Sequence, residues 1–182
     1  MNNRDAQFEL YRRFADAMLN TAYRITGNRE DAEDALQDAF ISAFKNLDNY
    51  REEATFGSWL KRIVINKALN LLKRKKAEMT FPEEGMPERS IEMNGINQSS
   101  FNPKVDMVLQ AMQQLPTGYR TVLSLYLVEG YDHEEISKIL SISKATSLTQ
   151  YHRGKKRLKE IIKKTQTKIT KDGQSGKVVH GT

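Results

Sequence analysis

Two aspartates four residues apart are candidates for metal binding or for contact with a partner. Asp34 and Asp38 share one face of a helix, and Asp31 and Glu33 lie just before them. Such carboxylates could hold a metal ion, or they could form an acidic surface that faces solvent or a protein partner. We favour the acidic surface, since charged helix faces are usually solvated or turned towards a partner.

Other patterns that would indicate catalysis are incomplete or missing. His133-Glu134-Glu135 opens like the zinc-protease motif, but Ser137 stands where the second histidine is required. The chain has no cysteine, which excludes disulfides and thiolate metal sites. It also has no glycine-rich phosphate loop and no nucleophile elbow. We therefore expect no catalytic residue, no bound metal and no cofactor.

The strongest pattern is a short helix, a three-residue turn and a long basic helix. Asp132 and Glu135 form a capping box at the start of the short helix, which ends at Leu140. Ser143 then caps the long helix, which we expect to end near Lys164. This arrangement is typical of a helix-turn-helix, whose second helix enters the major groove of DNA.

The second helix offers side chains for both bases and phosphates. Its first residues are placed to reach base edges, and Gln150 can bond an adenine through two hydrogen bonds. Basic residues one to two turns later suit phosphates. Candidates for bases are Lys144, Ser147, Thr149 and Gln150, and candidates for phosphates are Arg153, Lys155, Lys156 and Arg157. A merely solvated charged helix is the alternative, but the cap, the turn and the charge all favour DNA binding.

A second phosphate-binding candidate is a helix expected over residues 56–76. Its basic members are Lys61, Arg62, Lys73 and Arg74, although charge at a helix end also complements the helix dipole. Phe56 and Trp59 could stack on bases or belong to the core. Tyr50, in a polar loop, is the clearer candidate for an exposed aromatic.

Every strong periodicity is helical, which predicts an all-α fold. Apolar residues repeat at helical spacing over 7–26, Gly27 can end that helix, and Asn28 can cap a second helix that runs to about Asn46. After the polar loop 48–55 the third helix completes one small domain. We predict two small helical domains, at 5–76 and 104–164, joined by an acidic flexible linker at 77–103 and followed by a disordered tail at 165–182.

Composition is consistent with an intracellular protein that binds a polyanion. The formal net charge is +6 and the pI about 9.4. No run of 18 apolar residues could cross a membrane, and the polar N-terminus lacks a signal-peptide core. We expect a cytoplasmic protein without membrane insertion.

Taken together, the residues resemble the sigma-70 family of bacterial RNA polymerase sigma factors, in the compact extracytoplasmic-function group. The resemblance covers about residues 7–76 and 104–162. The matching motifs are Asp31-Ala32-Glu33-Asp34…Gln37-Asp38…Phe40 for region 2.2, Phe56…Trp59-Leu60…Ile63…Asn66…Leu72-Lys73-Arg74 for regions 2.3 and 2.4, and Leu115-Pro116…Tyr119-Arg120, Glu129-Gly130-Tyr131 and Thr146…His152-Arg153 for region 4.

The resemblance implies a transcription initiation factor that binds core RNA polymerase and directs promoter recognition and melting of the −10 element. It implies docking on the clamp helices of the polymerase largest subunit through Asp34, Gln37, Asp38 and Phe40. The −10 residues would be Asn49, Tyr50, Arg51, Phe56, Trp59, Lys61, Arg62, Asn66, Asn70, Lys73 and Arg74. The −35 residues would be Ser143, Lys144, Thr146, Ser147, Leu148, Thr149, Gln150, His152, Arg153, Lys156 and Arg157. The flap region of the polymerase and an anti-sigma factor are further partners that the resemblance suggests, and the linker would thread towards the RNA exit channel.

Two positions depart from the family pattern. Leu148 and Gln150 stand where basic residues are usual in the recognition helix. Either they read a different −35 sequence, with Leu148 against a thymine methyl group, or −35 binding is weak and another DNA-bound protein helps recruit the factor. We favour altered specificity.

Two other classes of protein fit parts of the pattern. A dimeric helix-turn-helix regulator would explain the C-terminal half, but the N-terminal half shows no heptad seam and no signature of a ligand pocket. A nuclease built on the acidic cluster is a more distant alternative.

Overall fold

The computed structural model describes residues 3–78 and 102–175, which form two compact units. Most of the predicted linker and the end of the predicted tail lie outside the described residues. The described elements are helical throughout, as expected. None of these helices is long and apolar enough to span a membrane.

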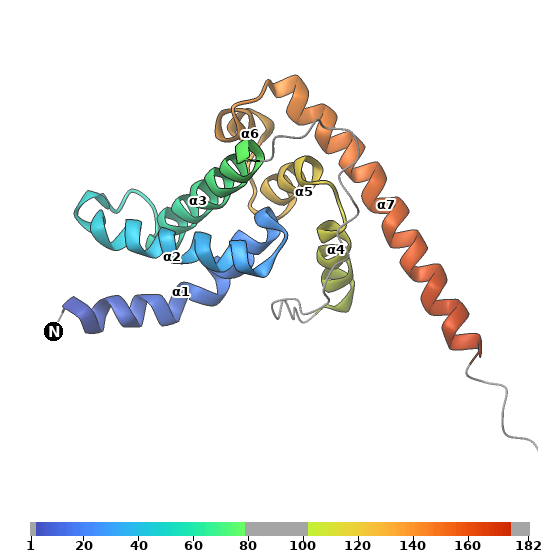
Figure 1. Cartoon of the computed structure of the whole chain (residues 1–182), viewed down its shortest axis with the longest axis horizontal. Coiled ribbons are helices and arrows are strands. Elements are labelled where there is room, and N and C mark those ends of the chain that lie inside the picture. Colours follow the sequence, from blue (N-terminus) through green and yellow to red (C-terminus); the bar gives the residue numbers. More distant parts are fainter. Residues whose placement is uncertain (1–2, 79–101, 176–182) are drawn as a thin grey trace, which may run out of the picture. The chain divides into compact units, whose positions relative to one another are not determined.

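The first unit is a three-helix bundle of α1 (Asn3–Thr26), α2 (Arg29–Lys45) and α3 (Phe56–Glu78), with a short 3-10 turn η1 (Leu47–Asn49) after α2 (Figure 1). All three pairs of helices pack against each other. Small residues on α2 let its neighbours approach closely, and branched residues on α3 fill the centre. The core includes Ala22, Ile25, Ala32, Ala35, Ala39, Leu60, Val64 and Ile65.

The predicted connection between the first two helices is confirmed. Gly27 has a φ of 80°, a left-handed conformation that glycine adopts without steric cost. Asn28 caps α2, because its side-chain oxygen accepts a hydrogen bond of 2.8 Å from the backbone amide of Asp31. The sharp turn sets α1 and α2 side by side and fixes which face of α2 remains outside.

The second unit contains α4 (Pro103–Gln113), α5 (Thr117–Leu123), a π-helical segment η2 (Ser124–Val128), α6 (His133–Leu140) and α7 (Lys144–Ser175). Helix α7 packs along both α4 and α5. Its anchoring residues Leu158 and Ile161 join a buried cluster with Ala111, Met112, Leu115 and Leu123. The long helix is therefore held by its own apolar face over several turns.

The predicted helix-turn-helix is present, with both predicted caps. Asp132 accepts hydrogen bonds from the amides of Glu134 and Glu135, and the Glu135 carboxylate accepts one from the amide of Asp132. Ser143 caps α7 by accepting from the amide of Thr146 at 3.0 Å. The turn between them includes Ser141 at a φ of 56°.

Helix α7 extends to Ser175, beyond the expected end near Lys164. Ile161 is still buried, and the hydroxyl groups of Thr165 and Thr167 donate to carbonyls four residues earlier. Lysine and glutamine are good helix formers, so the helix continues without a continuous apolar period. The first part of the predicted tail is helical for this reason.

Candidate functional site

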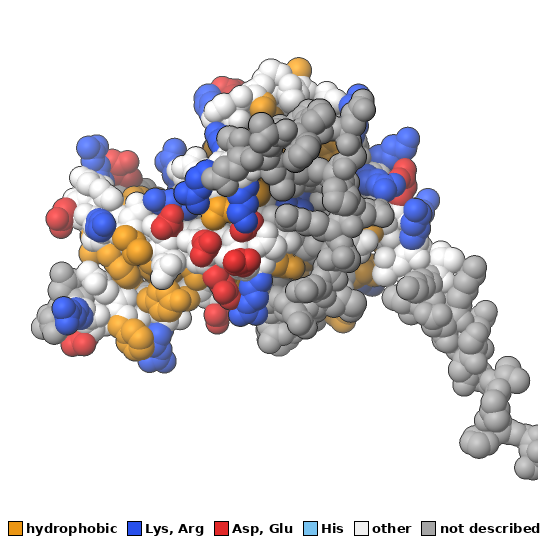
Figure 2. Space-filling view, in the orientation of Figure 1, with side chains coloured by type: hydrophobic (Ala, Val, Ile, Leu, Met, Phe, Trp, Pro, Cys, Tyr) orange, Lys and Arg blue, Asp and Glu red, His pale blue; other side chains and the backbone are white. Residues whose placement is uncertain are grey.

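The outer face of α2 carries the acidic group predicted from the sequence. Asp34, Gln37 and Asp38 are exposed, and spacings of three and four residues place them on one face. Figure 2 shows acidic side chains gathered over the α1–α2 part of the first unit, beside apolar ones. Ile41 continues this face with 48% of its surface exposed. Ile41 is not among the residues predicted from the sequence, although its spacings of four from Gln37 and three from Asp38 place it on this face.

Phe40, which was predicted to contact the polymerase, lies in the core and not on the exposed acidic face of α2. It is only 3% exposed, and its ring lies 4.8 Å from Tyr11 and 5.6 Å from Phe44, measured between ring centroids. Its position in the apolar stripe of α2 decides its role, because a buried aromatic contributes packing rather than a contact with a partner.

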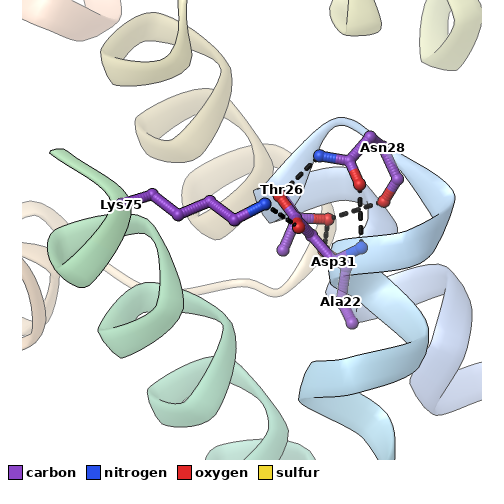
Figure 3. Close-up of polar contacts among 5 residues, drawn as sticks. All are labelled: Ala22, Thr26, Asn28, Asp31 and Lys75. Atoms are coloured by element: carbon purple, nitrogen blue, oxygen red, sulfur yellow. Dashed lines mark hydrogen bonds and ion pairs between the residues drawn. The ribbon is translucent and has the colours of Figure 1, made fainter. Parts of the chain in front are cut away.

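Asp31 is also separated from the acidic face, because its side chain is buried. Its carboxylate accepts from the Asn28 amide nitrogen at 2.5 Å and pairs with the ammonium group of Lys75, which reaches across from the last turns of α3 (Figure 3). Asp31 is therefore a structural residue. Within the parts of the chain that the structure describes, no three His, Asp or Glu side chains are placed to hold a metal ion.

The polar loop before α3 is closed on a cluster of aromatic rings. The Tyr50 hydroxyl donates to the carbonyl of Ala54 at 2.6 Å, and the Tyr50 ring lies 5.3 Å from Trp59 and 5.8 Å from Phe56. All three rings are half-buried, so Tyr50 is less exposed than its polar surroundings suggest. Asn49 and Arg51 flank this ring cluster and are exposed.

Helix α3 presents a polar and basic stripe next to this loop. Arg62, Asn66, Asn70 and Arg74 recur every fourth residue and are all exposed, with Lys73 exposed beside them. Lys61 is half-buried at the edge of the stripe. The basic residues at the end of α3 differ in their contacts. Lys75 forms an ion pair with Asp31 of α2, whereas Lys73 and Arg74 are exposed and can contact a partner.

Helix α7 has two opposite faces. Residues 147, 154, 158 and 161 are buried, whereas residues 145, 149, 152, 156, 159 and 163 are exposed. The exposed set follows spacings of three and four residues and the buried set spacings of seven, four and three, so each forms one side of the helix. The exposed side begins at the turn, where a recognition helix meets base edges.

Several residues that were predicted to contact bases form hydrogen bonds within the protein. Ser147 is fully buried, and its hydroxyl shares a hydrogen bond of 2.9 Å with Nδ1 of His133. In this conformation the Ser147 hydroxyl is turned towards α6 and away from solvent, and the residue joins α7 to α6. The hydroxyls of Ser143 and Thr146 bond each other at 2.8 Å in the cap, and Thr149 donates to the carbonyl of Ala145.

Gln150 is placed differently from Leu148. Gln150 is half-buried beside α5. The side-chain oxygen of Gln150 would lie 3.2 Å from a Cβ atom added at Gly118 of that helix. Leu148 is 38% exposed and borders the outward face with Ala145 and His152. Of the two departures from a basic pattern, Leu148 is the one presented to solvent.

The remaining basic residues of α7 are exposed. Arg153 and Lys156 are exposed, and Arg157 lies 3.2 Å from Glu160 in a surface ion pair. Lys144 lies 3.9 Å from Glu134, and both side chains are largely exposed. Such surface pairs contribute little energy and leave the cations available to phosphates.

A ring cluster of His133, Tyr126 and Tyr151 supports the helix-turn-helix and was not predicted from the sequence. The imidazole of His133 stacks on Tyr126 with ring centroids 4.6 Å apart, and Tyr151 of α7 contacts both rings at 4.8 Å and 5.3 Å. This cluster supports the hydrogen bond to Ser147. It joins residues up to 25 positions apart, so local sequence patterns carry no signal for it.

Comparison with known proteins agrees with this geometry. The model of Sigma-70 region 2 matches residues 10–78, and the model of Sigma-70 region 4 matches residues 106–158. Together they cover about two thirds of the chain.

Related sequences and a solved structure give the same result. The extracytoplasmic-function factor SigE of Mycolicibacterium smegmatis is 33% identical over 158 residues, covering 86% of this chain and 61% of SigE. SigW of Bacillus subtilis is 28% identical over 170 residues, covering 88% of this chain and 91% of SigW. The fold is similar to that of the sigma factor RpoE from Bartonella quintana, solved with the anti-sigma factor NepR, with a TM-score of 0.59, 19% identity and coverage of 85% and 95%. The chain therefore belongs to the sigma-70 family, in the extracytoplasmic-function group of RNA polymerase sigma factors.

Proposed function

We propose that the two units of this transcription initiation factor divide its binding tasks between them. The first unit docks on core RNA polymerase through α2 and holds the melted −10 element with the loop and α3. The second unit reads the −35 duplex with α7. The protein itself makes and breaks no covalent bond, and its mechanism is the placement of polymerase on a promoter.

The observation that carries this proposal is the presence of an acidic face and a basic face on one small bundle. Asp34 and Asp38 project from α2, whereas Arg62, Asn66 and Arg74 project from α3. Acidic surface repels DNA and favours a basic protein partner, such as the polymerase clamp helices that the family resemblance implies. Basic surface attracts phosphates. One unit can therefore hold protein and DNA at the same time.

The loop before α3 suits single-stranded DNA. The Tyr50 hydroxyl closes the loop through its hydrogen bond to Ala54. The rings of Tyr50, Phe56 and Trp59 pack together and form an apolar surface next to the basic stripe. Unstacked bases bind such combinations of aromatic surface and positive charge. Asn66 and Asn70 add side-chain amides that can bond base edges beside the loop.

The second unit supports altered −35 specificity. Leu148 is presented on the side of α7 that meets DNA, and an apolar side chain there suits a thymine methyl group. Gln150 leans against α5, so we assign it a weaker part in base reading than Leu148. Lys156 and Arg153 supply phosphate contacts on either side.

Further partners follow from the family and the exposed surface. Tyr126, Leu127 and Val128 of η2 are exposed and form an apolar surface suited to the polymerase flap region. A solved sigma factor of similar fold was captured with an anti-sigma factor, and this chain is a candidate for similar control. Recruitment by another DNA-bound protein remains the alternative if −35 contacts prove weak.

Promoter-specific run-off transcription tests the proposal. Bacterial core polymerase, with and without this protein, is given a library of templates with randomised −35 sequences. We expect defined transcripts only with the protein, from templates enriched in thymine at the position that Leu148 contacts. Core binding without transcripts would point to a missing recruiting partner. Absence of core binding, with tight dimeric binding to palindromes, would instead support the stand-alone regulator.

The docking face is tested by charge reversal. Asp38→Lys should weaken core binding by about tenfold or more, because a like charge then faces the basic partner. Glu33→Lys is the matched control, since Glu33 is exposed on the same helix and pairs with Arg29, but lies roughly 140° around the helix from Asp38. Binding is measured by titrating labelled protein with core enzyme. Equal affinities for the two variants would remove the docking assignment.

A further inference from the structure

The exposed side of α7 continues as a row of lysines beyond the part of the chain that matches region 4. The family match ends at residue 158, whereas α7 continues to Ser175. Lys159 and Lys163 are exposed and follow His152 and Lys156 at spacings of three and four residues. They therefore lie on the same side of the helix as the residues that face DNA.

The part of α7 after residue 158 is anchored by apolar packing in its first turn. Ile161 is 9% exposed and belongs to the buried cluster with Met112 and Leu115 of the α4 region, and Ile162 packs against that cluster. Because the buried residues lie opposite the lysines, packing fixes the direction in which Lys159 and Lys163 project. The lysine row is a positioned surface.

The charge of this surface is offset only in part within the protein. From Lys144 to Lys171 the only acidic residue is Glu160, which borders the row between Lys156 and Lys163, and its carboxylate pairs with Arg157. Among the described residues, neither Lys159 nor Lys163 is part of an ion pair. A row of such cations along a helix is the electrostatic footprint of a polyanion.

We propose that Lys156, Lys159 and Lys163 form a second contact with promoter DNA, on phosphates that flank the −35 element. From Ala145 to Lys163 the helix rises roughly 27 Å, enough to pass from the base edges over the bordering phosphate backbone. The contact adds affinity without base specificity. It offsets the loss of cationic contacts at Leu148 and Gln150. The inference deepens the proposed function, because it assumes that α7 reads the −35 duplex.

Adjacent lysines on different sides of α7 provide a matched test. Lys163→Gln and Lys164→Gln remove one charge at the same distance along the helix, but only Lys163 lies on the row. The double variant Lys159→Gln/Lys163→Gln removes both new contacts. Each variant is assembled with core polymerase, and its affinity for a promoter fragment is measured between 50 and 200 mM salt. Circular dichroism checks that helix content is unchanged.

The expected result is a change in salt dependence confined to the row. Each phosphate contact contributes about 0.9 to the slope of log affinity against log salt, which is about 3.5-fold over this fourfold range of salt. The double variant should lower the slope by roughly 2 and weaken binding at low salt, without changing the preferred −35 sequence. Lys164→Gln should leave the slope unchanged.

Two further measurements decide what the row contacts. Trimming the duplex next to the −35 element should weaken the wild-type complex and leave the double variant unaffected. Equal slopes for wild type and double variant would overturn the inference, and so would weaker binding of the double variant to core polymerase without DNA, since the row would then contact protein. If wild-type holoenzyme gave no promoter-specific transcription, the proposed function itself would fail.

Discussion

At the scale of single residues, neighbouring charges with similar sequence surroundings have opposite tasks. Asp31 and Asp34 lie one turn apart in α2, yet one is buried in an ion pair and the other is exposed. Lys73, Arg74 and Lys75 are all exposed, but Lys75 is the one that pairs with Asp31. Residue type and spacing therefore define the charged blocks, whereas contact with a distant helix decides which members remain available to partners.

Replacing Asp31 by asparagine should destabilise the first unit by about 1–3 kcal/mol, because the buried oxygen loses the charge that pairs with Lys75. The free energy of unfolding is measured in urea through the fluorescence of Trp59, the only tryptophan in the chain. Asp34→Asn is the control and should change stability by less than about 0.5 kcal/mol. Equal effects of the two substitutions would show that the ion pair contributes nothing to stability.

At the scale of elements, the distance between α5 and α7 is set by a glycine. A Cβ atom at Gly154 would lie 3.0 Å from Cβ of Tyr119 and 3.1 Å from Cδ1 of Leu123. Glycine within a helix costs about 1 kcal/mol relative to alanine. The close approach of α5 explains why that cost is tolerated in the middle of a long helix.

Gly154→Ala should therefore destabilise the second unit, despite the higher helix propensity of alanine. Overpacking costs about 1–3 kcal/mol, which exceeds the gain of about 1 kcal/mol from propensity. Thermal unfolding followed by circular dichroism measures the change. Gly118→Ala is the matched control, because its Cβ would meet only the movable end of Gln150. A higher melting temperature for Gly154→Ala would show that α5 can move away.

The caps and turns of these elements could be predicted from the sequence. Asn28, Asp132 and Ser143 act within three residues of their own positions, so local spacing was sufficient to identify them. The burial of Ser147 and the pairing of Asp31 depend on partners 14 and 44 residues away. The predicted −35 set therefore included a buried serine, and the predicted docking set included the core residue Phe40. The end of α7 was predicted too early because its last turns lack a full apolar stripe.

At the scale of the whole molecule, the chain carries a net charge of +6 but keeps an acidic face. The local charge of each face therefore decides its partner more than the net charge does. At ordinary salt, screening limits the reach of each face's electrostatic field to about 10 Å. In the proposed complex, core polymerase covers the acidic face of α2, and this should favour DNA binding by the basic face.

The free protein should accordingly bind duplex promoter DNA weakly, as a monomer, and more weakly as salt rises. For each phosphate contact, raising the salt concentration from 50 to 200 mM should lower the affinity by about 3.5-fold. Fluorescence anisotropy measures the affinity, and sedimentation gives the oligomeric state. Core polymerase should strengthen binding to the same fragment. Tight binding by a dimer, insensitive to salt, would contradict a factor that acts through polymerase.

The ion pair between Asp31 and Lys75 also has a mechanical consequence. Lys75 lies in the last turns of α3, close to the point where the chain leaves the first unit towards the second, and Asp31 lies in the first turn of α2. Tension transmitted along the chain when both units are held by polymerase and DNA would reach this tie first. In the proposed complex, the ion pair would share this tension between α3 and α2, and would protect the end of α3 from unwinding while the basic stripe holds the promoter.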